Sequence, residues 1–268
     1  MQDKIQDLIY SSVLEILNNA HLKIPKLQEI HKNKIHFIPT KYRVLGGLLQ
    51  SMNIQFGNFI EVLMKNLIAI ESRYEILGVY SGKKNNHLSL SRINDKLIDS
   101  YITECQEGRH ANLENAFNNL CVQIFKNSKE TSDFIYLTHD IDLLFRDKEE
   151  GKLYYLEIKY NDDHDTGKFV DINRKFIKTY AYLISEFALN NHDDLVPILF
   201  FFNNKRMKCN IYVPEYQHIY RGQRFFKKFL STSYTDLEAY LSYFCDDPRN
   251  LKIFDKLFQT LTSSYINP

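Results

Sequence analysis

Two apolar runs on either side of a charged turn are the feature that most constrains this fold. Residues 143–145 and 153–156 are aliphatic and aromatic, and residues 148–151 between them read Lys-Glu-Glu-Gly. Apolar runs around a polar, glycine-containing segment predict a β-hairpin. The rest of the chain is then expected to build a sheet onto this hairpin.

The predicted hairpin places ionisable residues on one face. If the turn is centred on residues 149–150, Asp142 lies opposite Glu157 and Asp140 lies opposite Lys159. Side chains alternate along strands, so all four share a face. Opposed Cβ atoms are about 4.5–5.5 Å apart, where two carboxylates repel unless a cation lies between them. Mg²⁺ suits such a site because it takes carboxylate oxygens and keeps bound waters.

The order of Asp142, an apolar run, a turn and the tripeptide Glu157-Ile158-Lys159 resembles the core motif of the PD-(D/E)xK nuclease superfamily, and of type II restriction endonucleases within it. The resemblance implies an Mg²⁺-dependent, site-specific endonuclease for double-stranded DNA, with Mn²⁺ able to substitute. It assigns the metal to Asp142, Glu157 and the backbone carbonyl of Ile158. It gives Lys159 the role of positioning or activating the water that attacks the phosphate.

Alternatives to this interpretation remain open. Ile141 stands where the superfamily motif has Pro, which leaves Asp140 as an alternative to Asp142. A solvated edge hairpin with ordinary surface ion pairs would need no metal at all. The corresponding functional alternatives are a structure-selective or repair nuclease and a noncatalytic DNA-binding protein.

Two further stretches favour the nuclease interpretation. Residues 55–63, QFGNFIEVL, predict a helix that begins near Asn58 and runs to about residue 72, with Glu61 in its first turn. The resemblance implies that Glu61 reaches the metal site, although an acid in a first turn also complements the helix dipole. Residues 220–230, YRGQRFFKKFL, resemble a segment of several type II restriction enzymes, and their phenylalanines could equally be core residues.

The charge balance limits how DNA can be bound. The chain has 268 residues, with 34 Lys and Arg against 33 Asp and Glu, a formal net charge of +1. DNA contacts must therefore come from local basic patches. The candidates, chosen by charge and loop position, are Lys83, Lys84, Lys168, Lys205, Arg206, Arg221 and Arg224.

The remaining periodicity predicts an α/β fold, with a mixed central β-sheet flanked by helices and additional N- and C-terminal helices. We expect a single nuclease domain over residues 1–268, with a helix and basic arm in 1–52, a catalytic core in 53–230 and helices in 231–268. The expected helices are 3–20, 44–52, 171–192, 235–244 and 249–261, with more helix in 95–126 around a break near Gly108; the expected loops are 22–43, 78–91 and 161–167; further strands are 195–202 and 210–213.

Expectations about the cell and the partners follow from the same sequence. The N-terminus has no signal-peptide pattern and the four cysteines form no C-x-x-C pair, which indicates a reduced, cytoplasmic protein. Residues 51–57 resemble a sequence segment found in enzymes that cut short palindromes with an unspecified central base, so we expect such a target. A palindromic target implies a homodimer, and restriction implies a DNA methyltransferase encoded nearby. The loop over 161–167 invites a second metal site through His164 and its carboxylates, Asp162, Asp163 and Asp165, but a solvated loop explains them as well.

Overall fold

The computed structural model describes residues 2–129, 133–162, 165–206 and 208–263. The chain divides into two compact units, Met1–Leu63 with Thr232–Pro268, and Met64–Ser231. In chain order the elements are α1 (Gln2–Lys32), α2 (Thr40–Ile70), β1 (Tyr74–Ile76), β2 (Gly82–Ser91), α3 (Arg92–Gln106), α4 (Leu113–Ser128), β3 (Phe134–Ile141), β4 (Leu143–Asp147), β5 (Leu153–Lys159), α5 (Thr166–Glu186), a 3₁₀ turn (His192–Asp194), β6 (Leu195–Phe201), α6 (Glu215–His218), β7 (Ile219–Arg221), α7 (Gly222–Phe229), α8 (Tyr234–Asp246) and α9 (Pro248–Ser263).

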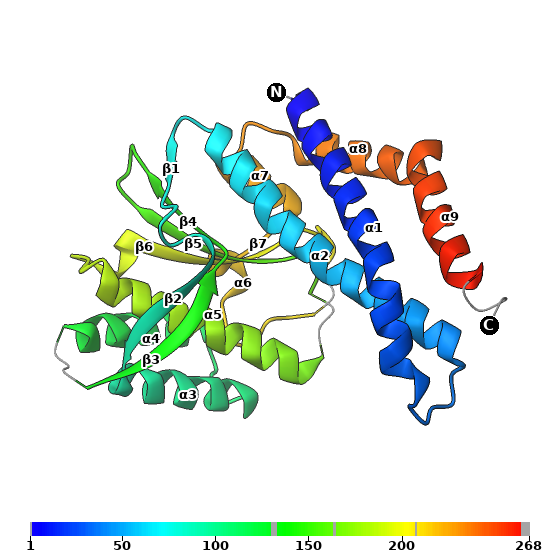
Figure 1. Ribbon diagram of the computed structural model, residues 1–268. Helices are drawn as coiled ribbons and strands as arrows, with labels where there is room; N and C mark the ends of the chain where they lie inside the picture. Colours follow the sequence, from blue (N-terminus) through cyan, green and yellow to red (C-terminus); the bar gives the residue numbers. More distant parts are fainter. Residues whose placement is uncertain (1, 130–132, 163–164, 207, 264–268) are drawn as a thin grey trace. The chain divides into compact units, whose positions relative to one another are not determined.

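A five-stranded mixed sheet in the order β1-β4-β5-β6-β7 forms the centre of the second unit (Figure 1). The pairs β1/β4 and β4/β5 are antiparallel, whereas β5/β6 and β6/β7 are parallel. Helix α5 is the crossover that joins the parallel strands β5 and β6. This arrangement confirms the predicted α/β class with a mixed central sheet.

Helices α5 and α7 cover opposite faces of this sheet (Figure 1). On one face the ring of Tyr155 stacks on Phe176 of α5, with centroids 5.5 Å apart. On the other face Tyr154 packs edge-on against Phe229 of α7 at 5.1 Å. Consecutive residues of β5 therefore point into two different apolar layers, so odd-numbered β5 residues face α5. The next strand, β6, is buried along nearly its whole length, which confirms the predicted two-sided burial.

The β4–β5 hairpin has the predicted register. Pairing runs from Leu143 opposite Leu156 to Arg146 opposite Leu153. The turn is held by Asp147, whose Oδ1 accepts hydrogen bonds from the backbone N–H groups that follow it at 2.9 and 3.2 Å. It closes at Gly151, with φ of 74°. Continuing this register by one residue places Asp142 opposite Glu157.

The expectation that Asp140 faces Lys159 is wrong. Asp140 belongs to β3, which pairs with β2 in a separate two-stranded sheet. Its Oδ1 accepts a hydrogen bond from the backbone N–H of Asn85 at 2.8 Å. The strand breaks at Asp142, where the chain passes from one sheet to the other, so the hairpin does not extend back to residue 140.

The partner strand β2 occupies most of the segment expected to be a loop. That expectation is wrong for Gly82–Ser91, which pairs along β3. The register shifts between Gly82 and Asn86, and Asn85 has a positive φ of 49°. A β-bulge of this kind bends the strand and leaves its extra residues exposed, and Lys83 and Lys84 lie in it.

The helices of the first unit are longer than the sequence indicated. Helix α1 continues through Pro25 to Lys32 and α2 begins at Thr40, so the predicted loop over 22–43 is wrong for residues 22–32 and 40–43. A proline inside a helix costs about 3 kcal/mol, but the apolar face continues past residue 20 and buries Ile24. Burying one such side chain contributes roughly 1.5–3 kcal/mol, so the core contacts offset much of that cost.

Other boundaries also differ from expectation. Helix α5 spans Thr166–Glu186 instead of the predicted 171–192. Helix α2 runs without a break from Thr40 to Ile70, so the predicted helix start at Asn58 is wrong. The predicted strand at 210–213 is also wrong: the Asn210 side chain accepts hydrogen bonds from the backbone N–H groups of Tyr212 and Val213, and the fifth strand is β7. The C-terminal helices α8 and α9 are confirmed. Among the described residues, no helix combines the length and apolarity that crossing a membrane would require.

Candidate active site

The hairpin brings Asp142, Glu157 and Lys159 together; we call these three residues the active-site cluster. Glu157 and Lys159 lie on β5, and Asp142 immediately precedes β4. The backbone N–H of Ile158 donates to Asp142 Oδ2 at 2.7 Å, which fixes the carboxylate against the neighbouring strand. Asp142 is 7% exposed and Glu157 is 1% exposed, so both carboxylates are buried.

The ammonium of Lys159 lies where three oxygens converge. Its Nζ is 2.8 Å from Glu157 Oε1, 2.9 Å from the carbonyl oxygen of Ile158 and 3.5 Å from Asp142 Oδ2. The positively charged ammonium of Lys159 therefore lies among the oxygens of the three predicted ligand residues. The geometry shows that these oxygens face a common point.

Two residues that the sequence analysis did not assign to the site also contact Glu157. The hydroxyl of Tyr155 donates to Oε2 at 3.0 Å, and Lys175 Nζ donates to Oε1 at 3.0 Å. Lys175 comes from α5, next to Phe176, which stacks on Tyr155. The sequence carries only part of this signal: Lys175 flanks the apolar stripe of α5, but the packing of α5 decides which β5 residues that helix faces.

Burial and charge shift the pKa values of the two carboxyls in opposite directions. Burial, followed by the charge of Glu157, raises the pKa of Asp142. Burial also opposes ionisation of Glu157, but the charges and hydrogen bonds of Lys159 and Lys175 outweigh it and lower the pKa of Glu157. Burial and then Lys175 lower the pKa of His139 on β3, whose Nδ1 has no hydrogen-bond partner within the described residues.

The donor set fits a hard divalent cation. Two carboxylates and a backbone carbonyl are oxygen ligands, and Mg²⁺ is commonly held by one or two carboxylates while it retains several waters. The described parts of the chain contain no group of three or more His, Cys, Asp or Glu able to hold a metal ion, so the Ile158 carbonyl and waters would have to complete the ligand set around the two carboxylates. Of the residues of the predicted second metal site, Asp163 and His164 lie outside the described residues. Asp162 pairs with Arg221, and Asp165 accepts a hydrogen bond from the backbone N–H of Lys168 at the start of α5.

The other predicted site residues lie in several places. Glu61 is in the interior of α2, within the first compact unit, rather than in a first turn. Lys83 and Lys84 are exposed in the β2 bulge next to β3, and Lys168 is exposed in the first turn of α5. Further exposed basic residues follow β6, namely Lys205 and Arg206.

Protein contacts engage both arginines near β7. Arg221 is 12% exposed in its side chain and forms ion pairs with Asp162 at 2.9 Å and Glu215 at 3.1 Å. Arg224 donates to the carbonyl oxygens of Glu215, Tyr216 and Ile219 and lies over the ring of Tyr220. Their guanidinium groups therefore brace the α6–β7 region.

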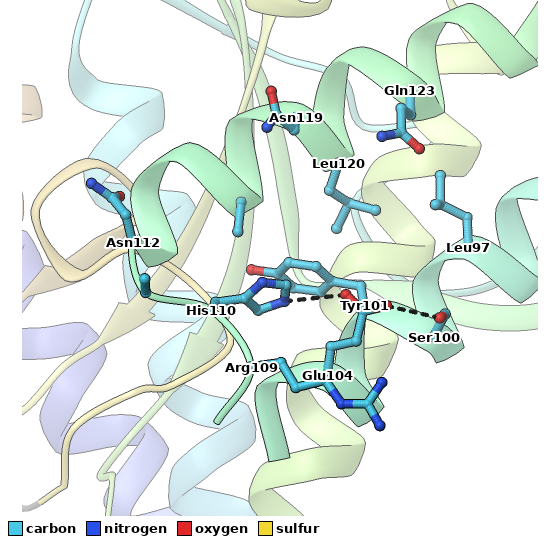
Figure 2. A pocket seen from close by; sticks show the side chains of 12 residues that line it. Leu97, Ser100, Tyr101, Glu104, Arg109, His110, Asn112, Asn119, Leu120 and Gln123 are labelled. Carbon is cyan, nitrogen blue, oxygen red and sulfur yellow. Dashed lines mark hydrogen bonds and ion pairs between the residues drawn. The ribbon is translucent and has the colours of Figure 1, made fainter. Parts of the chain in front are cut away.

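A pocket of about 360 Å³ lies elsewhere in the second unit, between α3 and α4 (Figure 2). The ring of Tyr101 stacks on His110 there, and Glu104 lies 3.5 Å from the His110 Nε2 atom. No residue of the active-site cluster lines this pocket. The chemistry of the hairpin is therefore separate from it.

Comparisons with known proteins identify the family of the chain. Residues 1–245 match the family model described as type II restriction endonuclease, HinfI. The chain is 52% identical over 263 residues to the type II restriction enzyme HinfI of Haemophilus influenzae, covering 97% of this chain and 98% of that protein. No solved structure matches the chain. The chain belongs to the HinfI family of type II restriction endonucleases, enzymes that hydrolyse DNA at specific sites.

Proposed function

We propose that Asp142, Glu157 and the carbonyl of Ile158 hold the divalent ion required for DNA cleavage, and that this ion is Mg²⁺, with Mn²⁺ able to replace it. The observation that carries the proposal is the convergence of these three oxygens on the Lys159 ammonium, within 3.5 Å in every case. When bound, such an ion supplies charge neutralisation at a phosphate and lowers the pKa of water.

The protein groups around the ion have separate roles in this proposal. Lys159 positions the attacking water and stabilises negative charge that develops on the phosphate. The N–H of Ile158 and the hydroxyl of Tyr155 keep the two carboxylates oriented. Glu61 is proposed to support the site as an additional carboxylate.

Double-stranded DNA is the substrate, and exposed basic residues near the active-site cluster are proposed to contact its phosphates. The β2 bulge carries Lys83 and Lys84 and pairs with the strand that leads directly into Asp142. Lys168, Lys205 and Arg206 offer further exposed positive charge. We assign Arg221 and Arg224 a supporting role at this surface, because protein contacts hold their guanidinium groups.

The proposed target is a short palindrome with an unspecified central base, cut by a homodimer in which each copy is one nuclease domain. Symmetric DNA is matched by symmetric protein, with one active site for each strand. The enzyme is proposed to act in the cytoplasm. A DNA methyltransferase encoded nearby would protect the host sites.

The proposal is tested by digestion of unmethylated phage DNA with and without Mg²⁺. We expect the wild type to give discrete fragments with Mg²⁺ only, and Glu157→Gln and Lys159→Ala to lose at least about 100-fold in rate. The matched controls are Glu75→Gln on β1 and Lys96→Ala on α3, both exposed residues of the same unit. Both controls are expected to cut at the wild-type rate.

Particular outcomes would contradict the proposal. Cleavage by Lys159→Ala at the wild-type rate would remove this residue from the reaction. Cleavage that survives thorough metal removal would exclude the metal role of the two carboxylates. Mapping the fragment ends tests the palindromic target, and end sequences without two-fold symmetry would overturn it.

A further inference from the structure

Glu157 carries two ammonium groups on a single oxygen atom. Its Oε1 accepts from Lys159 at 2.8 Å and from Lys175 at 3.0 Å. With Asp142 alongside, two carboxylates face two ammonium groups, so the described cluster is close to neutral. A divalent cation that binds Glu157 must compete with both lysines, because each occupies a direction from which Oε1 would coordinate it.

The two lysines are not held equally. Lys159 also contacts the Ile158 carbonyl and lies near Asp142, whereas the contact recorded for Lys175 within the described chain is the one with Glu157. The Lys175 side chain is 31% exposed, against 22% for Lys159. Lys175 is therefore the ammonium that leaves with the smaller loss of contacts, and its long, flexible side chain already reaches solvent.

We propose that Lys175 is a displaceable counter-ion, which neutralises Glu157 before metal binds and moves to a DNA phosphate once a divalent cation takes its place. This inference rests on the proposed function, and it makes Lys175 a positioning residue. It gives α5 a role besides covering the sheet: the helix keeps the cluster neutral without metal and supplies a positive charge to DNA when the metal is present.

The first test is Mn²⁺ binding to the DNA-free protein, followed by electron paramagnetic resonance of the unbound ion. Removing a nearby positive charge favours a cation, so Lys175→Met is expected to bind Mn²⁺ on the order of tenfold more tightly than the wild type. Lys175→Arg keeps the charge and is expected to stay within about twofold of the wild type. Lys175→Gln serves as a second neutral variant if Lys175→Met does not fold.

The matched control is Lys178→Met. Lys178 lies three residues later on α5 and pairs with Asp95 at 2.6 Å and Asp99 at 3.1 Å instead of Glu157. Its removal costs α5 a paired lysine but leaves the carboxylate pair untouched, so we expect Mn²⁺ affinity within about twofold of the wild type. Unchanged or weaker Mn²⁺ binding by both neutral Lys175 variants would overturn the counter-ion role.

The second test measures transfer to DNA through the salt dependence of binding, with Ca²⁺ or with no metal. The logarithm of the DNA-binding constant falls linearly with the logarithm of the salt concentration, and loss of one phosphate contact makes this fall less steep by about 0.9. We expect Lys175→Met to show this decrease with Ca²⁺ and not without it. An equal slope change in both conditions, or none in either, would overturn the transfer.

The same series separates this inference from the proposed function. If the wild type binds Mn²⁺ no better than Glu157→Gln does, the metal site itself fails. If Glu157→Gln loses Mn²⁺ while the neutral Lys175 variants bind as the wild type does, only the role of Lys175 fails.

Discussion

Among single residues, Asp142 and Glu157 are buried carboxylates. Burying an ionised carboxylate lowers the free energy of unfolding, so the stability of the protein should depend on the protonation of Asp142. Burial, and then the charge of Glu157, raise the pKa of Asp142 to about 6. The pKa of an unfolded aspartate is near 3.8. The folded protein therefore binds this proton more tightly than the unfolded chain, and ionising Asp142 as the pH rises through 4 to 6 destabilises the fold.

We therefore predict that Asp142→Asn abolishes cleavage and yet stabilises the metal-free protein at pH 8. The gain should be up to about 3 kcal/mol at pH 8 and should vanish below about pH 3, where the carboxyl is protonated in both states. Urea unfolding in EDTA at the two pH values measures it. Glu157→Gln is the contrasting control: Lys159 and Lys175 lower the pKa of Glu157, so this variant should be less stable than the wild type at pH 8. Destabilisation of both variants would contradict the charge argument.

Strand alternation predicts one contact of the active-site cluster and not another. The pairing of Asp142 with Glu157 followed from strand alternation and a turn centre, and the structure has that register. Lys175 did not follow, because its contact depends on which face of the sheet α5 covers, and this is a tertiary property. Tyr155, the other residue that donates to Glu157, was predicted only as part of an apolar run, although its hydroxyl reaches that carboxylate.

At the scale of elements, the strong periodic segments were predictable and the boundaries were not. The buried strand β6 and helices α3, α4, α8 and α9 follow from apolar spacing alone. Pro25 and Gly57 are helix-breaking signals, and both lie inside long helices. The low helix propensity of these two residues does not end the helices. An apolar face continues on either side of each residue, and its burial by tertiary contacts stabilises the helix.

Two glycines test that distinction with the same substitution. Gly151 closes the hairpin turn with φ of 74°, and an alanine there would be strained, so Gly151→Ala should destabilise by about 1 kcal/mol. Gly57 lies inside α2, and an added Cβ meets nothing within 4 Å, so Gly57→Ala should stabilise by about 0.5–1 kcal/mol. Thermal unfolding of both variants checks the signs. A destabilising Gly57→Ala would indicate that the chain breaks near Asn58 after all.

For the whole molecule, the number of active-site clusters in one chain differs from the number of strands in its DNA substrate. One chain presents one active-site cluster, built within a single hairpin, whereas duplex DNA has two strands to cut. On the proposed palindromic target, a two-fold dimer would place one correctly oriented cluster at each strand in a single binding event. A monomer would need two separate binding events with opposite orientations to break the duplex.

Mixed dimers separate these two routes. We predict that wild-type and Glu157→Gln chains, co-expressed with different tags and purified through both, form a heterodimer that nicks supercoiled plasmid at the recognition site but does not linearise it. The reason is that only one of the two clusters retains the carboxylate that faces Asp142, so one strand is cut for each binding event. Agarose electrophoresis separates nicked from linear plasmid, and the doubly wild-type dimer purified with the same tags should give linear product directly. Failure to isolate any doubly tagged species on or off DNA, or linear product at the wild-type rate from the heterodimer, would contradict the assignment of one active site to each strand.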